Sequence, residues 1–233
     1  TVEELYINGF HLEQYKQHNY KPQDYYTEGL RRDPGDIRCN TSMARLALKN
    51  GRFKESLAYS NKAIERLTDR NEHPADTEAF YLKGLALEFL GRYNEAYNIL
   101  YRAAWNYPHR SAALFELACL DCRNGDYPAA LEKLEESIGL NKGHTKAHNL
   151  KTAVLRKLGS PSAAQSAQDG VNDDLLDLFA LIEYTHFEDV TAKIAPFAAK
   201  AENLLDVARD YMKAGFLKDA EFALSFAEQS HPL

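Results

Sequence analysis

Residues 79–104 read AFYLKGLALEFLGRYNEAYNILYRAA, and this stretch decides the fold. Before Gly91, apolar and small residues recur at the three- and four-residue spacing of an amphipathic helix. After it, residues 95–104 repeat that spacing. Glycine readily takes the left-handed conformation that ends a helix, so the stretch predicts two helices joined by a turn at Gly91. Such a pair cannot bury its apolar face alone, and neighbouring pairs must stack against it.

The same turn recurs along the chain. Gly51, Gly91, Gly125 and Gly215 are each followed two residues later by an aromatic or apolar residue and then by Ala or Ser, and Gly159 starts a looser copy. The glycines at 91, 125 and 159 are evenly spaced by 34 residues. Strand-like alternation is absent. The predicted fold class is therefore all-α, a right-handed α-solenoid of stacked antiparallel helix pairs.

Residues 77–110 resemble the tetratricopeptide repeat (TPR), a motif of small and bulky residues at fixed positions. The matching residues are Phe80, Gly84, Leu87, Ala96, Leu100, Ala103 and Pro108. The units 37–70, 111–144 and 201–233 match less completely, and 111–144 has Asp121 where an apolar residue is usual. In 145–178 the match is degenerate, because Gln168-Asp169-Gly170 is expected to break the second helix.

The resemblance implies a TPR-like superhelix and a division of the chain. Residues 1–36 form an N-terminal segment and a partial repeat helix. Residues 37–178 form four TPR-like units, of which the fourth is degenerate. Residues 179–200 form a helical insertion that Pro196 interrupts, and 201–233 form a C-terminal TPR-like unit.

The composition narrows the function classes. Among 233 residues, 45% hydrophobic and 27% charged side chains are typical of a folded, water-soluble protein. No apolar run approaches the roughly 18 residues that span a bilayer. A net charge of -6 disfavours nucleic-acid binding. Three cysteines cannot all pair, which favours a reducing, cytoplasmic location. The chain begins at Thr1 without an initiator Met, which favours a piece of a longer protein.

Two motifs resemble metal or redox sites, and both have simpler interpretations. Cys119-Leu120-Asp121-Cys122 has CxxC spacing, but it falls inside a predicted helix and lacks further ligands, so packing is favoured. His144 and His148 could share a helix face as metal ligands, yet the glutamate of an HExxH motif is missing between them. The glycine patterns of nucleotide-binding loops are missing too. We therefore expect no enzyme, no cofactor and no metal.

The TPR resemblance implies where a partner would bind. In that family the first helix of each pair lines a concave groove, and the equivalent positions here include seven basic, three aromatic and two acidic residues. The candidate residues are Arg38, Arg45, Lys49, Tyr81, Phe89, Phe115, Lys146, Asn149 and Arg156. Arginine binds carboxylates strongly and aromatic residues anchor interfaces, so we expect a non-catalytic scaffold that binds an acidic protein segment or peptide. The ordered lysine–asparagine pattern of carboxylate-clamp TPRs is missing, which disfavours a chaperone-tail receptor.

Other interpretations stay open. The candidate residues could form solvated helix faces or be covered by residues 172–200. Residues 11–15, 30–36 and 175–180 are also similar to the C-terminal repeat region of large bacterial proteins with an upstream mutarotase-like β-sandwich. That resemblance implies an accessory or self-association module of a carbohydrate-related enzyme, with residues 5–20 packed against the upstream domain. RNA binding is a third interpretation, but it would require basic and aromatic residues at matching positions of every repeat, and the candidate positions here are irregular. No nucleic-acid or membrane partner is expected.

Overall fold

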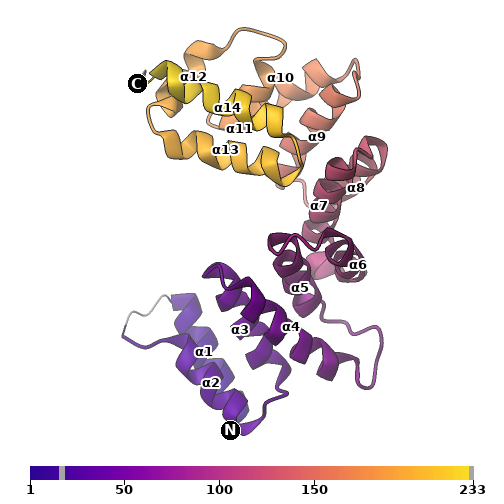
Figure 1. The fold of residues 1–233 in the computed structure, drawn as a ribbon, viewed down its shortest axis with the longest axis vertical. Helices are drawn as coiled ribbons and strands as arrows, with labels where there is room; N and C mark the ends of the chain where they lie inside the picture. Colours follow the sequence, from indigo (N-terminus) through magenta and orange to yellow (C-terminus); the bar gives the residue numbers. More distant parts are fainter. Residues whose placement is uncertain (16–18, 231–233) are drawn as a thin grey trace. The chain divides into compact units, whose positions relative to one another are not determined.

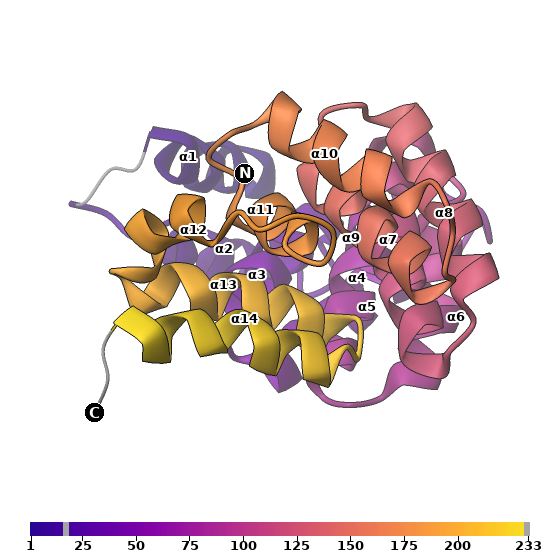
Figure 2. The same ribbon diagram turned by 90° about the horizontal axis from the view of Figure 1, so that it is seen from above.

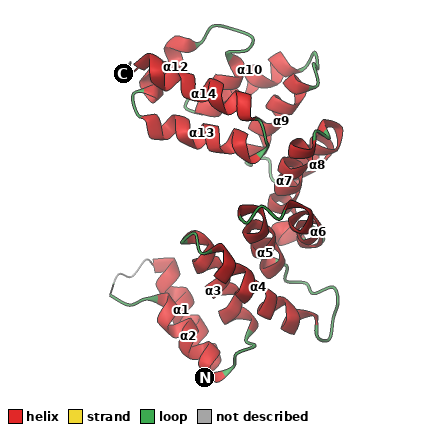
Figure 3. Cartoon of the chain, in the orientation of Figure 1, coloured by secondary structure: helices red, strands yellow, loops and turns green. Residues whose placement is uncertain are grey.

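A computed structural model describes residues 1–15 and 19–230, and residues 231–233 of the expected C-terminal unit lie outside it. Over the described ranges every regular element is a helix and none is a strand (Figure 3). The all-α prediction is therefore confirmed. The chain forms two compact units, Thr1–Ala113 and Leu114–Leu233.

The first unit is a stack of helix pairs (Figure 1). Its helices are α1 (Val2–Tyr15), α2 (Pro22–Arg32), α3 (Ile37–Lys49), α4 (Phe53–Thr68), α5 (Glu78–Phe89) and α6 (Tyr93–Ala103), and α7 (Tyr107–Asn124) begins within it. Each of the pairs α1–α2, α3–α4 and α5–α6 packs along its length, and α4 also packs on α5.

The N-terminal segment contains a helix pair, where the sequence indicated only one repeat helix. Tyr26 of α2 is fully buried under α1. Its hydroxyl donates a 2.6 Å hydrogen bond to Glu13, and its ring lies 6.3 Å from that of Tyr6. A Cβ atom at Gly9 would come within 2.6 Å of the Tyr26 ring. Gly9 therefore lets α1 approach α2 closely, and the first helix of the leading pair is complete.

The second unit contains the rest of α7 and the helices that follow it. They are α8 (Tyr127–Leu140), α9 (Thr145–Lys157), α10 (Ala163–Asp173), α11 (Leu178–Tyr184), α12 (Thr191–Ala198), α13 (Ala201–Lys213) and α14 (Leu217–Ser230). Buried side chains from α7 through α14 share one hydrophobic core. Figures 1 and 2 both show α13 and α14 side by side as the last pair.

The predicted break at residues 168–170 is wrong, because α10 runs through it without interruption. A Cβ atom at Gly170 would lie 3.3 Å from the Cβ of Ala180 in α11. The glycine therefore serves the close approach of α11, which outweighs its weak helix propensity. Pro196, expected to interrupt the insertion, lies inside α12.

All five repeat glycines end helices with positive φ angles, between 64° and 79°. The helix stops predicted from their spacing are confirmed. Gly215 also allows a close contact with α7, because a Cβ atom there would lie 3.2 Å from the Cα of Arg123. Arg123 also donates a 2.9 Å hydrogen bond to the carbonyl oxygen of Met212. The turn between α13 and α14 thus rests directly on the end of α7, and the second unit closes on itself.

Candidate partner-binding face

The nine candidate residues divide between the two units. Arg38, Arg45 and Lys49 lie on α3, and Tyr81 and Phe89 lie on α5. We call these five residues of the first unit the open face. The other four lie on α7 and α9 in the second unit, and they are Phe115, Lys146, Asn149 and Arg156. The two groups have very different surroundings.

The two arginines of the open face are paired within the first unit. Arg45 makes 3.0 Å ion pairs with Glu13 of α1 and with Glu78 of α5, so it joins three first helices. Arg38 makes two 2.8 Å hydrogen bonds to Glu3 of α1, and its guanidinium lies 4.8 Å from the centre of the Tyr6 ring. These carboxylates offset much of the expected positive charge. The sequence prediction missed Glu3 and Glu13 because it did not recognise α1 as part of a pair.

The far end of the open face is accessible. Lys49 is exposed at the end of α3 and has no ion-pair partner over residues 1–15 and 19–230. Phe89 is 62% exposed at the end of α5 and stacks on Phe53, with ring centroids 4.4 Å apart. Tyr81 is half-buried, and its ring stacks on His109 at 5.8 Å. This end combines a cation with a solvent-exposed aromatic ring.

In the second unit the candidate residues on α7 and at the start of α9 contact neighbouring helices of the same unit. Phe115 is only 8% exposed, and the Nζ of Lys213 lies 5.4 Å from the centre of its ring. Lys146 pairs with Asp210 of α13 at 2.9 Å. These contacts join α7 and α9 to α13.

Asn149 of α9 is buried and donates a 2.7 Å hydrogen bond to Asp177. Asp177 in turn accepts hydrogen bonds from the first backbone N–H groups of α11. The Asn149 side chain therefore fixes the start of α11.

Arg156 is the centre of a buried charge network. It donates two 2.8 Å hydrogen bonds to Glu183 and a third to Asp219. Lys157 donates to the second oxygen of Asp219, and the Tyr211 hydroxyl donates to Glu183. Burial works to raise the pKa of Asp219, but the hydrogen bonds from Lys157 and Arg156 outweigh it, and the pKa is lowered. The network is satisfied internally and joins α9, α11, α13 and α14.

The cysteine and histidine motifs occupy structural positions. Cys119 and Cys122 are buried within α7, and burial raises the pKa of Cys122 to about 12, which disfavours a thiolate. A ring nitrogen of His144 lies 3.2 Å from the Ser137 hydroxyl, and one of His148 lies 3.0 Å from the Lys142 carbonyl oxygen. Within the described part of the chain, no cluster of three or more potential ligands could hold a metal ion.

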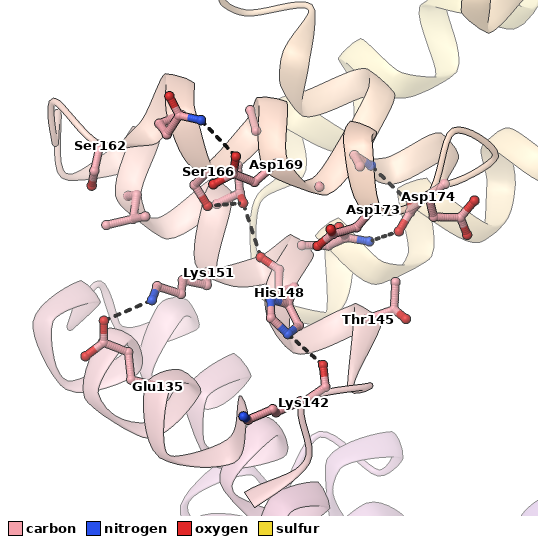
Figure 4. A pocket seen from close by; sticks show the side chains of 18 of the residues that line it. Glu135, Lys142, Thr145, His148, Lys151, Ser162, Ser166, Asp169, Asp173 and Asp174 are labelled. Atoms are coloured by element: carbon pink, nitrogen blue, oxygen red, sulfur yellow. Dashed lines mark hydrogen bonds and ion pairs between the residues drawn. The ribbon is translucent and has the colours of Figure 1, made fainter. Parts of the chain in front are cut away.

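A polar pocket of about 650 Å³ lies beside α9 and α10 (Figure 4). Its polar side chains largely satisfy one another: Lys151 pairs with Glu135, and the hydroxyls of Thr152 and Ser166 lie 2.7 Å apart. Acidic side chains line its other side, and they are Asp169, Asp173, Asp174 and Asp177. Of the candidate residues only Asn149 reaches it, and that amide is bound to Asp177.

The fold is similar to that of known TPR proteins, although no protein-family model matches the sequence. The apo form of RapI superposes with a TM-score of 0.70 at 13% identity, covering 98% of this chain and 97% of that one. A tetratricopeptide repeat protein from Parabacteroides merdae gives a TM-score of 0.65 at 13% identity, covering 99% and 93%. YrrB, described as a TPR protein with an unusual peptide-binding site, gives 0.50 at 18% identity, covering 89% and 92%. The chain therefore has the TPR-like fold of stacked helix pairs.

Among the described helices, none is both long and apolar enough to cross a membrane.

Proposed function

We propose that this chain is a non-catalytic scaffold that binds a protein segment, and that the segment binds to the open face of the first unit. The TPR-like fold supports this proposal, and one similar structure, YrrB, is described as having a peptide-binding site. Exposed first-helix side chains offer a partner both a cation and aromatic rings, which are typical of interface anchors.

The contrast between the two units carries the proposal. In the second unit Lys146, Asn149 and Arg156 are held by carboxylates of their own unit. To reach Arg156, a partner would have to displace the completely buried carboxylate of Glu183, at a large cost in free energy. In the first unit Lys49 and Phe89 are exposed already, so a partner can contact them without breaking the core.

A peptide selection tests this proposal. The chain is used to select binders from a random peptide library, and their affinities are measured by calorimetry. The variant Lys49→Glu/Tyr81→Ser changes the open face. The variant Lys62→Glu/Tyr101→Ser makes the same substitutions at exposed positions on the second helices α4 and α6.

We expect the open-face variant to bind selected peptides about tenfold more weakly, a loss of about 1.4 kcal/mol, and the control variant to bind them as the parent does. Circular dichroism establishes that both variants are folded. Failure to select any binder, or equal loss in the two variants, contradicts the proposal.

A further inference from the structure

Phe53 and Phe89 form a stacked aromatic pair on the first unit. Phe53 is the first residue of α4 and Phe89 the last residue of α5. Their ring planes are within 4° of parallel, with centroids 4.4 Å apart, while Phe89 stays 62% exposed. Solvent therefore still reaches much of one ring of the stack. Covering such a ring with an apolar side chain is favourable, because aromatic rings bury a large area.

Two turns closed by backbone hydrogen bonds flank this pair. The N–H of Arg52 donates to the Ala47 carbonyl oxygen at 2.8 Å, and the N–H of Arg92 donates to the Leu87 carbonyl oxygen at 2.9 Å. Both turns contain a glycine with positive φ, so they share one helix-ending geometry. The aromatic pair is thus positioned before any partner arrives, which reduces the entropy lost on binding.

Two exposed lysines lie close to Phe53 in the sequence. Lys49 lies four residues before Phe53 and Lys54 directly after it, and both are exposed. Neither pairs with a carboxylate anywhere in the described ranges. By contrast, the arginines of the two turns have carboxylate partners. Arg52 pairs with Glu55 at 3.0 Å, and Arg92 pairs with Glu95 at 2.6 Å. Glu88, directly before Phe89, is half-buried, so within the described ranges the two lysines are the exposed cations beside the pair without an ion-pair partner.

We propose that the Phe53–Phe89 pair is the anchor point of the open face, and that it binds an acidic segment of a partner protein. The segment places an aromatic or long aliphatic side chain on the exposed Phe89 ring, with carboxylates on either side that pair with Lys49 and Lys54. This inference rests on the proposed function and specifies its partner. Charge complementarity selects acidic over basic segments, and the ring supplies the apolar anchor.

Three short synthetic peptides test the inference by fluorescence anisotropy. The first has a central Phe flanked by Glu residues, the second replaces the Phe by Ser, and the third replaces each Glu by Lys. We expect the parent chain to bind the first peptide, and to bind the other two at least about tenfold more weakly. Binding of the first should weaken as salt is raised, because exposed charges are screened.

Two variants and one control locate the site. Phe89→Ser and Lys54→Glu should each weaken binding of the first peptide by about fivefold or more, while Lys62→Glu on the same helix as Lys54 should not. The inference is overturned if the lysine peptide binds as well as the glutamate peptide, if none of the three binds, or if both variants bind like the parent.

The library experiment separates this inference from the proposed function. One outcome would support the proposed function and overturn this inference. The selected peptides would bind Lys49→Glu/Tyr81→Ser more weakly than the parent, but would contain no acidic residues and would bind Phe89→Ser as they bind the parent. If the library yields no binder at all, the proposed function fails as well.

Discussion

Arg156 of α9 and Glu183 of α11 are joined by two hydrogen bonds of 2.8 Å, and the Glu183 side chain is completely buried. A buried carboxylate is costly unless every part of it is paired, and Glu183 also accepts a 2.6 Å hydrogen bond from Tyr211. Through Asp219 the same arginine contacts α14. This pair therefore holds the C-terminal helices on α9.

Replacing Glu183 by Gln should destabilise the protein strongly. The change removes the charge that compensates Arg156 in a buried site, and loss of one partner of such a pair costs about 3–5 kcal/mol. Urea denaturation measures this free energy of unfolding. As a control, Arg31→Gln breaks an exposed pair with Glu28 and should cost less than about 1 kcal/mol. Similar costs for the two substitutions would show that the buried network is not a main support of the second unit.

Gly215→Ala should cost more stability than Gly91→Ala. Both glycines have positive φ, 79° and 73°, so each alanine pays for the left-handed backbone, roughly 1 kcal/mol. Only at 215 does the added Cβ also press on the backbone of Arg123, at 3.2 Å, whereas at 91 it meets no atom within 4 Å. Thermal or urea unfolding of the two variants checks the order. Equal losses would contradict the close contact between the last turn and α7.

Stability should fall as the pH drops below about 6.5 because of His144. Burial, and then the nearby cations His148, Lys146 and Lys213, lower the pKa of His144 from its usual 6.5. The unfolded chain then takes up the proton more readily, so stability is full above 6.5 and is lost as the pH falls toward the folded-state pKa. His144→Asn should reduce the pH dependence of the unfolding midpoint between about 7 and 5.5, and the part that remains comes from His186, whose pKa burial also lowers. An unchanged slope would contradict this assignment.

The cysteines should be unreactive in the folded protein. All three are buried, and burial raises the pKa of Cys39 and Cys122 to about 12. Because the thiolate is the reactive form, a chromogenic thiol reagent near pH 8 should label native protein slowly and urea-unfolded protein fully. Rapid labelling of the native chain would show that α7 opens far more often than its packing suggests.

The helix pairs were predictable because their signals are local. The positive φ of Gly91 and Gly125 follows from the need to end a helix, and each glycine can be identified in the sequence.

The role of Asp121 could not be predicted from the sequence. It occupies a usually apolar position of its repeat, and its burial is offset by Lys133 of α8, at 2.7 Å.

The surroundings of the candidate residues were not predictable, because they depend on distant segments. Arg156 and Asp219 are separated by 63 residues, and nothing local indicates that they meet. The main prediction assumed that first-helix positions remain open, as in an extended stack. Cover by residues 172–200 was the stated alternative, and Asn149 and Arg156 bind Asp177 and Glu183 of that segment. In the second unit the α13–α14 pair instead packs back on α7, which buries Phe115 and pairs Lys146.

The most direct test of the central claim compares two lysines, one from each unit. Lys49 on α3 is exposed without an ion-pair partner in the described ranges, whereas Lys146 on α9 is paired with Asp210. The affinity of a library-selected peptide is measured by calorimetry for the parent, Lys49→Glu and Lys146→Glu. We predict that Lys49→Glu weakens binding about fivefold, as one part of the loss expected for the double variant, and that Lys146→Glu leaves it unchanged. Loss of binding in Lys146→Glu alone would contradict the assignment of the binding face to the first unit.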